Sequence, residues 1–166
     1  MAQLLVSDTS VLIDLERGSL LQATFQLPTP LAVPDVLYER ELRAGNGEFL
    51  LSLGLRRLSL DHAGATLAQT YISRARALSV PDAFALALAK QGGHVLVCGD
   101  RALRELAAAE QVICHGLLWV LDEILAANIL SGADLAAALR AIAEHPRCRL
   151  PQAIVTEHLD RYSRSK

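Results

Sequence analysis

Long apolar runs are absent from this sequence. No uninterrupted run approaches the roughly 20 residues that a membrane-spanning helix needs, and the longest apolar stretch, residues 116–129, is broken by Asp122 and Glu123. The amino terminus has no basic segment, and its apolar run at residues 4–6 is too short for a secretory signal. We therefore expect a cytoplasmic protein that does not cross a membrane.

Cysteine is also scarce. Three are present, Cys98, Cys114 and Cys148, and no two of them have the CxxC spacing of a zinc site or a redox pair. Because their number is odd and two of them lie in apolar runs, we expect buried free thiols. The HExxH, GxGxxG, GxSxG and P-loop motifs are absent as well, so the enzyme classes that these motifs define are not indicated.

Neither sign of charge is in strong excess. The 166 residues include 16 basic and 18 acidic ones, a formal net charge of −2, which excludes a whole-surface basic nucleic-acid binder. Any contact with a phosphate backbone is therefore expected to come from a local patch. A hydrophobic fraction of 52% with 20% charged residues excludes intrinsic disorder.

Short apolar runs alternate with segments of helical periodicity, which indicates an α/β fold. We predict a three-layer sandwich whose central parallel sheet has about four to five strands flanked by helices. The chain is predicted to form one domain over residues 1–166, with a core at about 4–130 and a helical extension at about 131–166. Residues 50–60 fit a helix or a strand equally well. The predicted strands are 4–6, 31–33, 94–98 and 112–114; the predicted helices are 11–17, 35–43, 62–78, 83–91, 101–110, 116–128, 131–144 and 156–162.

Four acidic residues stand at the boundaries of these elements. Asp8 directly follows the first predicted strand, and Asp100 directly follows the third. Asp82 begins a helix, and Glu39 lies one turn into the helix after the second strand. In a parallel α/β sheet, the carboxyl ends of the strands and the amino ends of the helices share one edge, where such folds place their sites. The four carboxylates are therefore expected to converge.

Segment lengths support this convergence for one pair. Helix 83–91 would rise about 13 Å at ~1.5 Å per residue, and strand 94–98 would return about 16 Å at ~3.3 Å per residue. Asp82 and Asp100 are thus expected at the same edge, although 18 positions separate them.

Such a cluster needs a counter-charge. Two carboxylates about 4 Å apart repel by ~4 kcal/mol at an effective dielectric constant near 20. A divalent cation relieves this repulsion, and oxygen ligands suit Mg²⁺ or Mn²⁺. A hydrated metal at an open edge activates water and stabilises a leaving oxygen in phosphodiester hydrolysis.

Each acid taken alone also has a structural interpretation. Asp82 and Asp100 stand where an aspartate commonly accepts hydrogen bonds from the free N–H groups of a helix. Glu39 has basic residues beside it and would pair with Arg40 or Arg43. The position of all four at one edge is what favours a shared site.

These segments resemble the PIN-domain family of metal-dependent ribonucleases, which includes the VapC-type toxins of toxin–antitoxin pairs. The resemblance extends from about residue 4 to 130. The opening Asp-Thr-Ser is weakly specific alone, and its combination with the Pro-Asp-Ala helix start and the strand ending in Gly-Asp is more specific. The matching stretches, in the order in which the family has them, are residues 6–15, 33–39, 79–89 and 95–100.

The resemblance implies that Asp8, Glu39, Asp82 and Asp100 bind Mg²⁺ or Mn²⁺, as one or two ions, and carry out catalysis. Thr9 or Ser10 would support the site through its hydroxyl group. The implied protein is an endoribonuclease that leaves a 5′-phosphate and a 3′-hydroxyl. It would be the toxin of a toxin–antitoxin pair, would form a homodimer and would be neutralised by an antitoxin protein.

Two departures from the family pattern bear on the number of metal ions. Many relatives carry Thr or Ser two positions before the last aspartate, where this chain has Cys98. Many also carry a further acid just after that aspartate, where this chain has Ala102 and Leu103. Arg101 and Arg104 lie beside the last aspartate and would contact substrate phosphates or remain solvated helix charges.

Two alternatives stand beside the nuclease hypothesis. One is a catalytically inactive PIN-like scaffold that acts by binding protein or RNA. The other is a phosphotransfer protein, which fits poorly because Asp8 begins Asp-Thr-Ser and lacks the Asp-x-Asp spacing of one phosphatase class. The chain has only two lysines, Lys90 and Lys166, and neither stands at a plausible receiver-domain position.

Overall fold

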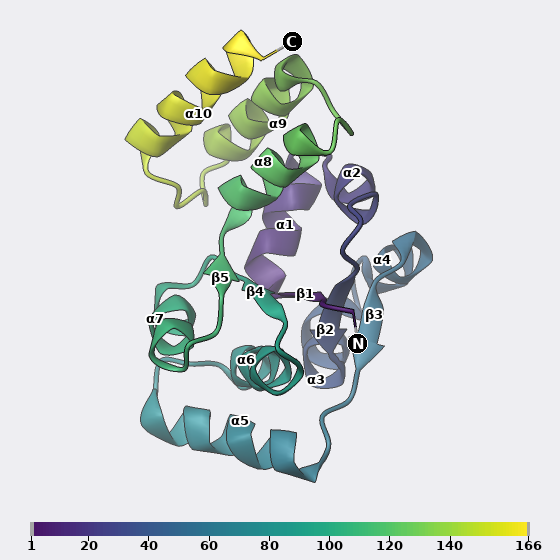
Figure 1. Ribbon diagram of the computed structural model, residues 1–166, viewed down its shortest axis with the longest axis vertical. Helices are drawn as coiled ribbons and strands as arrows, with labels where there is room; N and C mark the ends of the chain where they lie inside the picture. Colours follow the sequence, from purple (N-terminus) through teal and green to yellow (C-terminus); the bar gives the residue numbers. More distant parts are fainter. Residues whose placement is uncertain (1, 166) are drawn as a thin grey trace. The chain divides into compact units, whose positions relative to one another are not determined.

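The computed structural model describes residues 2–165, which divide into two compact units (Figure 1). Within the described residues, unit 1 comprises 2–11 and 28–116, and unit 2 comprises 12–27 and 117–165. The organisation expected from the sequence, one domain with a helical extension from residue 131, stays a prediction.

Unit 1 contains a five-stranded sheet in the order β3-β2-β1-β4-β5, with every neighbouring pair parallel. The predicted α/β class and parallel sheet are therefore confirmed. Apolar runs identified four of the strands. The fifth, β3, is an exposed edge strand that begins with two arginines. The strands are β1 (Leu5–Ser7), β2 (Leu31–Pro34), β3 (Arg56–Leu58), β4 (Val95–Val97) and β5 (Cys114–His115).

The register of β1 and β4 brings the carboxyl ends of these two strands to the same level. Leu5 lies opposite Val95 and Ser7 lies opposite Val97. The N–H of Asp8 then donates to the carbonyl of Val97 at 2.9 Å. The residues that directly follow β1 and β4 therefore begin side by side at one edge of the sheet.

Helix α6 packs directly against β1, β2 and β4, and α5 packs against α6. Most residues of α6 are buried, small ones such as Ala83 and Ala87 among them. The ambiguous segment 50–60 forms the end of α4 and then β3, separated by Gly54 at a φ of 118°. The helices of this unit are α3 (Asp35–Leu37), η1 (Tyr38–Leu42), α4 (Gly47–Leu53), α5 (His62–Arg74), α6 (Val80–Gly92) and α7 (Arg101–Ala109).

The predicted helix 35–43 exists, but its second half is wider than an α-helix. Element η1 is a π-helix, in which the N–H of Arg43 donates to the carbonyl of Tyr38, five residues earlier, at 2.8 Å. A π-turn takes one more residue than an α-turn, and such turns are frequent at functional sites. The side chains of η1 therefore have different directions from those that α-helical spacing predicts.

Unit 2 is helical within its described residues. Helix α1 begins in unit 1 and continues into unit 2, where α9 and α10 pack against each other. Ser131 and Asp134 form a capping box at the start of α9. Helix α2 was not predicted because it has only five residues. The helices are α1 (Thr9–Arg17), α2 (Leu21–Phe25), α8 (Leu117–Ala126), α9 (Gly132–Glu144) and α10 (Gln152–Arg164).

Candidate functional site

Asp8 is the most deeply buried of the predicted site residues. Its exposed fraction is 2%. One carboxylate oxygen, Oδ1, accepts from the N–H of Val11 at 2.9 Å, and Oδ2 accepts from the N–H of Gly99 at 3.0 Å. The hydroxyl group of Ser10 lies 2.9 Å from both oxygens. The side chain thus joins the end of β1 to the start of α1 and to the loop after β4.

Burial raises the pKa of Asp8, because a carboxylate loses its hydration there. The hydrogen bonds from Val11, Gly99 and Ser10 act in the opposite direction, since they favour the charged form. The negative charge of Asp100 raises the pKa further. The two carboxylates that follow β1 and β4 therefore interact electrostatically.

Asp100 and Asp82 both lie at helix amino termini, but they bond differently there. Asp100 is the N-cap of α7, and its Oδ2 accepts from the N–H of Leu103 at 2.9 Å. The N-cap of α6 is Ser79, whose hydroxyl oxygen accepts from the N–H of Asp82 at 3.2 Å. The capping interpretation is thus confirmed for Asp100. It is wrong for Asp82, because Ser79 already occupies that role.

The pKa of Asp82 is raised to about 6. The largest cause is burial, followed by the charge of Asp8, with smaller contributions from Asp100 and Glu41. A hydrogen bond with Ser79 lowers it in part. The structure therefore brings Asp8, Asp82 and Asp100 into one electrostatic cluster at the edge of the sheet.

This shift gives a prediction for the metal-free protein. A carboxyl group with a folded-state pKa of about 6 and an unfolded value of 3.8 binds its proton more tightly when folded. Its contribution to stability is therefore complete below about pH 4 and is lost as the pH rises through about 6. Asp82→Asn cannot ionise, so we expect it to be more stable than wild type by about 1–2 kcal/mol at pH 8, after allowance for solvent screening.

Chemical denaturation of both proteins at pH 4, 6 and 8 in the presence of EDTA measures this difference. The difference in unfolding free energy between the two proteins is expected to vanish towards pH 4, so the acidic sample is an internal control. If the difference is absent at pH 8, or is larger in acid, the raised pKa of Asp82 is contradicted.

Glu39 and Glu41 both lie on η1, and the structure gives them different neighbours. Glu39 accepts from Arg43 at 2.7 Å and pairs with Arg57 of β3 at 3.5 Å. Glu41 accepts a hydrogen bond from the hydroxyl group of Thr9, and its charge raises the pKa of Asp82. Of the two glutamates, Glu41 is the one whose charge raises the pKa of Asp82, whereas Glu39 pairs with Arg43 and Arg57.

The different neighbours of Glu39 and Glu41 are not evident from the sequence. Spacing along an ordinary α-helix, counted from the preceding strand, favoured Glu39. The π-turn changes the directions of the side chains along this segment, and no residue type in Tyr-Glu-Arg-Glu-Leu marks such a turn. The hydroxyl group of Thr9 bonds Glu41 and that of Ser10 bonds Asp8. The supporting roles of these two residues at a catalytic site stay a prediction.

The donor chemistry of this cluster fits a hard divalent cation. All of its ligand atoms are carboxylate or hydroxyl oxygens, which suit Mg²⁺ or Mn²⁺, and a cation would offset the repulsion that raises the pKa of Asp82. Within residues 2–165, no three His, Cys, Asp or Glu side chains are arranged as a ready-made metal site. Mg²⁺ commonly binds through only one or two carboxylates and keeps several waters. The oxygen-rich cluster is therefore compatible with Mg²⁺ binding even without a ready-made group of three ligands among the described residues.

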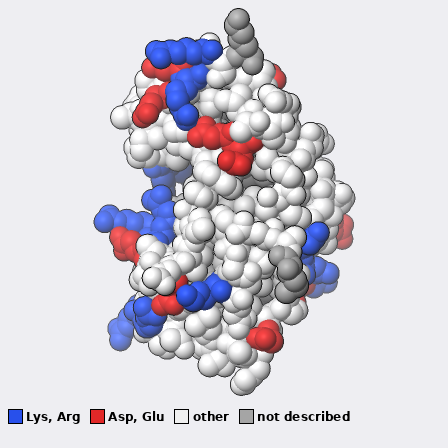
Figure 2. All heavy atoms as spheres, viewed as in Figure 1, with Lys and Arg blue, Asp and Glu red and all other residues white. Residues whose placement is uncertain are grey.

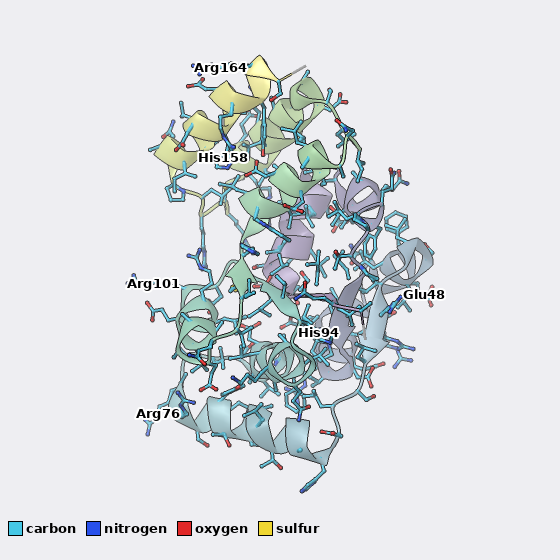
Figure 3. All side chains as sticks on the ribbon, viewed as in Figure 1. Glu48, Arg76, His94, Arg101, His158 and Arg164 are labelled. Atoms are coloured by element: carbon cyan, nitrogen blue, oxygen red, sulfur yellow. The ribbon has the colours of Figure 1, made fainter. Side chains whose placement is uncertain are left out.

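The two arginines predicted to contact substrate lie on α7. Arg101 is 87% exposed and pairs with Glu105 at 3.0 Å, at the periphery of unit 1 (Figure 3). Arg104 is also exposed. On the face shown in Figure 2, basic side chains form several separate groups, most with acidic side chains beside them. Phosphate binding by Arg101 or Arg104 stays a prediction.

A family model described as a PIN domain matches residues 4–164, nearly the whole chain. The chain therefore belongs to the PIN-domain family, as the sequence motifs predicted. PIN domains are generally nucleases, so the fold is a nuclease-like one. No curated protein matches the sequence. Among the described residues, no helix combines the length and the apolar character that crossing a membrane requires.

Proposed function

We propose that this protein is a metal-dependent endoribonuclease that hydrolyses phosphodiester bonds in RNA. The observation that carries the proposal is the electrostatic cluster of Asp8, Asp82 and Asp100, in which burial and mutual repulsion raise the pKa of Asp82 to about 6. Perturbed carboxylates grouped at the carboxyl edge of a parallel sheet are typical of functional sites. Membership of the PIN-domain family supports a nuclease activity.

In the proposed mechanism, Asp8, Asp82 and Asp100 would hold one or two Mg²⁺ or Mn²⁺ ions. The bound cation would activate water and offset the charge on the phosphate and the leaving oxygen. Ser10 and the N–H groups of Val11 and Gly99 fix the orientation of Asp8. Attack on phosphorus in line with the leaving 3′ oxygen gives a 3′-hydroxyl and a 5′-phosphate.

The fourth acid of the proposed site is Glu41, in the role that the family resemblance assigns to Glu39. Its contact with Thr9 and its effect on Asp82 support this choice. It would bind the cation or accept a proton from the attacking water. The hydroxyl group of Thr9 keeps its carboxylate towards the aspartates.

The activity is tested by incubating a structured RNA with the purified protein in Mn²⁺, in Mg²⁺ and in EDTA. We expect cleavage with either ion, none in EDTA, and recovery when Mn²⁺ is added in excess of the chelator. Analysis of the new ends is expected to find 5′-phosphates. Equal cleavage in EDTA would exclude the metal-dependent mechanism, and no cleavage under any condition would exclude the nuclease.

The biological setting that we propose is the toxin side of a toxin–antitoxin pair in the cytoplasm, with a homodimer as the active form. This part of the proposal depends on the resemblance to VapC-type toxins. A small upstream reading frame whose product binds the protein and suppresses RNA cleavage would support it.

An inactive scaffold is the second candidate, and one observation favours it. Asp8 and Asp100 accept backbone hydrogen bonds at helix starts, so both would remain useful to the fold without catalysis. Calorimetric titration with Mn²⁺ separates the two functions. A folded protein that binds no Mn²⁺ would support the scaffold.

A further inference from the structure

Cys98 and Cys114 form a close thiol pair in unit 1. Cys98 directly follows β4, and Cys114 begins the neighbouring strand β5. The N–H of Cys98 donates to the carbonyl of His115 at 2.9 Å, so the two strands are still joined at this level. The two Sγ atoms are 3.0 Å apart, whereas a disulfide bond measures about 2.05 Å. A movement of about 1 Å would therefore bring the sulfur atoms to bonding distance.

The pair lies directly beside the proposed site. Gly99, the residue after Cys98, donates its N–H to Asp8, and Asp100 follows it. A shift of the Cys98 backbone towards β5 would therefore move the segment that positions two of the three aspartates. Cys98 is fully buried, whereas Cys114 is partly exposed and accessible to a small oxidant.

We propose that Cys98 and Cys114 form a reversible disulfide when the protein meets a peroxide, and that this bond lowers the activity of the adjacent site. The first half stands on the geometry of the thiol pair alone. The second half rests on the proposed nuclease function.

The reaction balances with hydrogen peroxide as the oxidant. The thiolate of Cys114 attacks one peroxide oxygen, so an S–O bond forms, the O–O bond breaks and hydroxide leaves. The sulfur of Cys98 then attacks the sulfur of Cys114, the S–O bond breaks, and the oxygen leaves as water with the thiol proton of Cys98. Two thiols lose two electrons in total, and peroxide is reduced to water. A dithiol reductant reverses the bond by exchange.

Peptide mapping tests the bond without any activity assay. The protein is treated with hydrogen peroxide, its remaining thiols are alkylated under denaturing conditions, and trypsin is added. We expect peptide 91–101, which contains Cys98, to be linked to peptide 105–140, which contains Cys114. Cys148 falls in the separate dipeptide 148–149 and is expected to be alkylated. Alkylation of all three cysteines after oxidation, or a link to Cys148, would overturn the proposal.

The effect on the site is measured on the same samples. Because a misplacement of about 1 Å can cost up to about 100-fold in rate, we expect oxidation to lower Mn²⁺-dependent RNA cleavage about tenfold or more. A dithiol reductant is expected to restore the rate. Cys114→Ala is expected to resist this loss, and the matched control Cys148→Ala is expected to lose activity as wild type does.

A linked peptide pair with an unchanged cleavage rate would overturn the regulatory half. If the reduced protein cleaves no RNA at all, the nuclease proposal fails, and the Mn²⁺ affinity of the reduced and oxidised forms is compared instead. An affinity that oxidation does not change would then overturn the regulatory half, while the peptide map still decides whether the bond forms.

Discussion

Asp8→Asn is expected to lower Mn²⁺-dependent RNA cleavage at least about 100-fold while the protein remains folded. Changes next to a metal ligand commonly cost about 10–100-fold, and Asp8 is proposed as a ligand itself. The asparagine side chain has nearly the same shape but carries no charge and has a single acceptor oxygen. It would therefore lose both its attraction for a cation and one of its two backbone hydrogen bonds, to Val11 or to Gly99.

The stability of this variant is expected to change little. One unpaired backbone N–H costs about 1–3 kcal/mol. Removal of a buried charge that raises the pKa of Asp82 offsets part of this cost. Initial cleavage rates and thermal unfolding are measured together, so that a loss of activity is not confused with a loss of fold.

Asp14→Asn provides a matched control. Asp14 lies on α1, the helix that begins directly after Asp8. It belongs to unit 2, where it pairs with Arg17 at 3.3 Å. We expect its cleavage rate to remain within about twofold of wild type. Equal activity of Asp8→Asn and wild type would remove the central residue from the proposed mechanism.

The second large effect is expected at η1, where Glu41→Gln should lower cleavage about tenfold or more. Glutamine keeps the length of the side chain and its contact with Thr9, so the loss reports the missing negative charge beside Asp82. The rate is measured across a Mn²⁺ titration. We expect the variant to need more Mn²⁺ for half-maximal cleavage.

Glu39→Gln is the comparison that decides between the two glutamates. Its ion pairs with Arg43 and Arg57 are exposed, so they contribute little to stability. We expect this substitution to reduce cleavage less than Glu41→Gln does. The reverse order would favour the assignment that the family resemblance implies and would show that the neighbours of Glu41 are incidental.

The sheet was largely predictable because its central strands are buried on both faces. Strands β1, β2 and β4 are continuous apolar runs, and the alternation with helices indicated parallel pairing. Strand β3 was left ambiguous because an exposed edge strand containing Arg56 and Arg57 has no apolar run. Its neighbour Gly54, which ends α4 in a left-handed conformation, marks the boundary only once the backbone is known.

The three aspartates were predictable for a different reason. Asp8 and Asp100 directly follow parallel strands, and the lengths of α6 and β4 return the chain to the level of Asp82. Glu41 was not predictable, because its position depends on the hydrogen-bond pattern of η1 and not on residue type. The Cys98–Cys114 pair depends on the register between β4 and β5, which two short strands do not encode in their sequence.

The π-turn also affects how this chain should be aligned with its relatives. A relative with an α-helix throughout this segment would reach the position of Glu41 with one residue fewer after the proline that ends β2. A correct alignment then needs a one-residue gap inside 38–42. An ungapped alignment counts the residues after the proline as though the segment were α-helical throughout, and would pair each residue beyond the π-turn with the wrong position of such a relative.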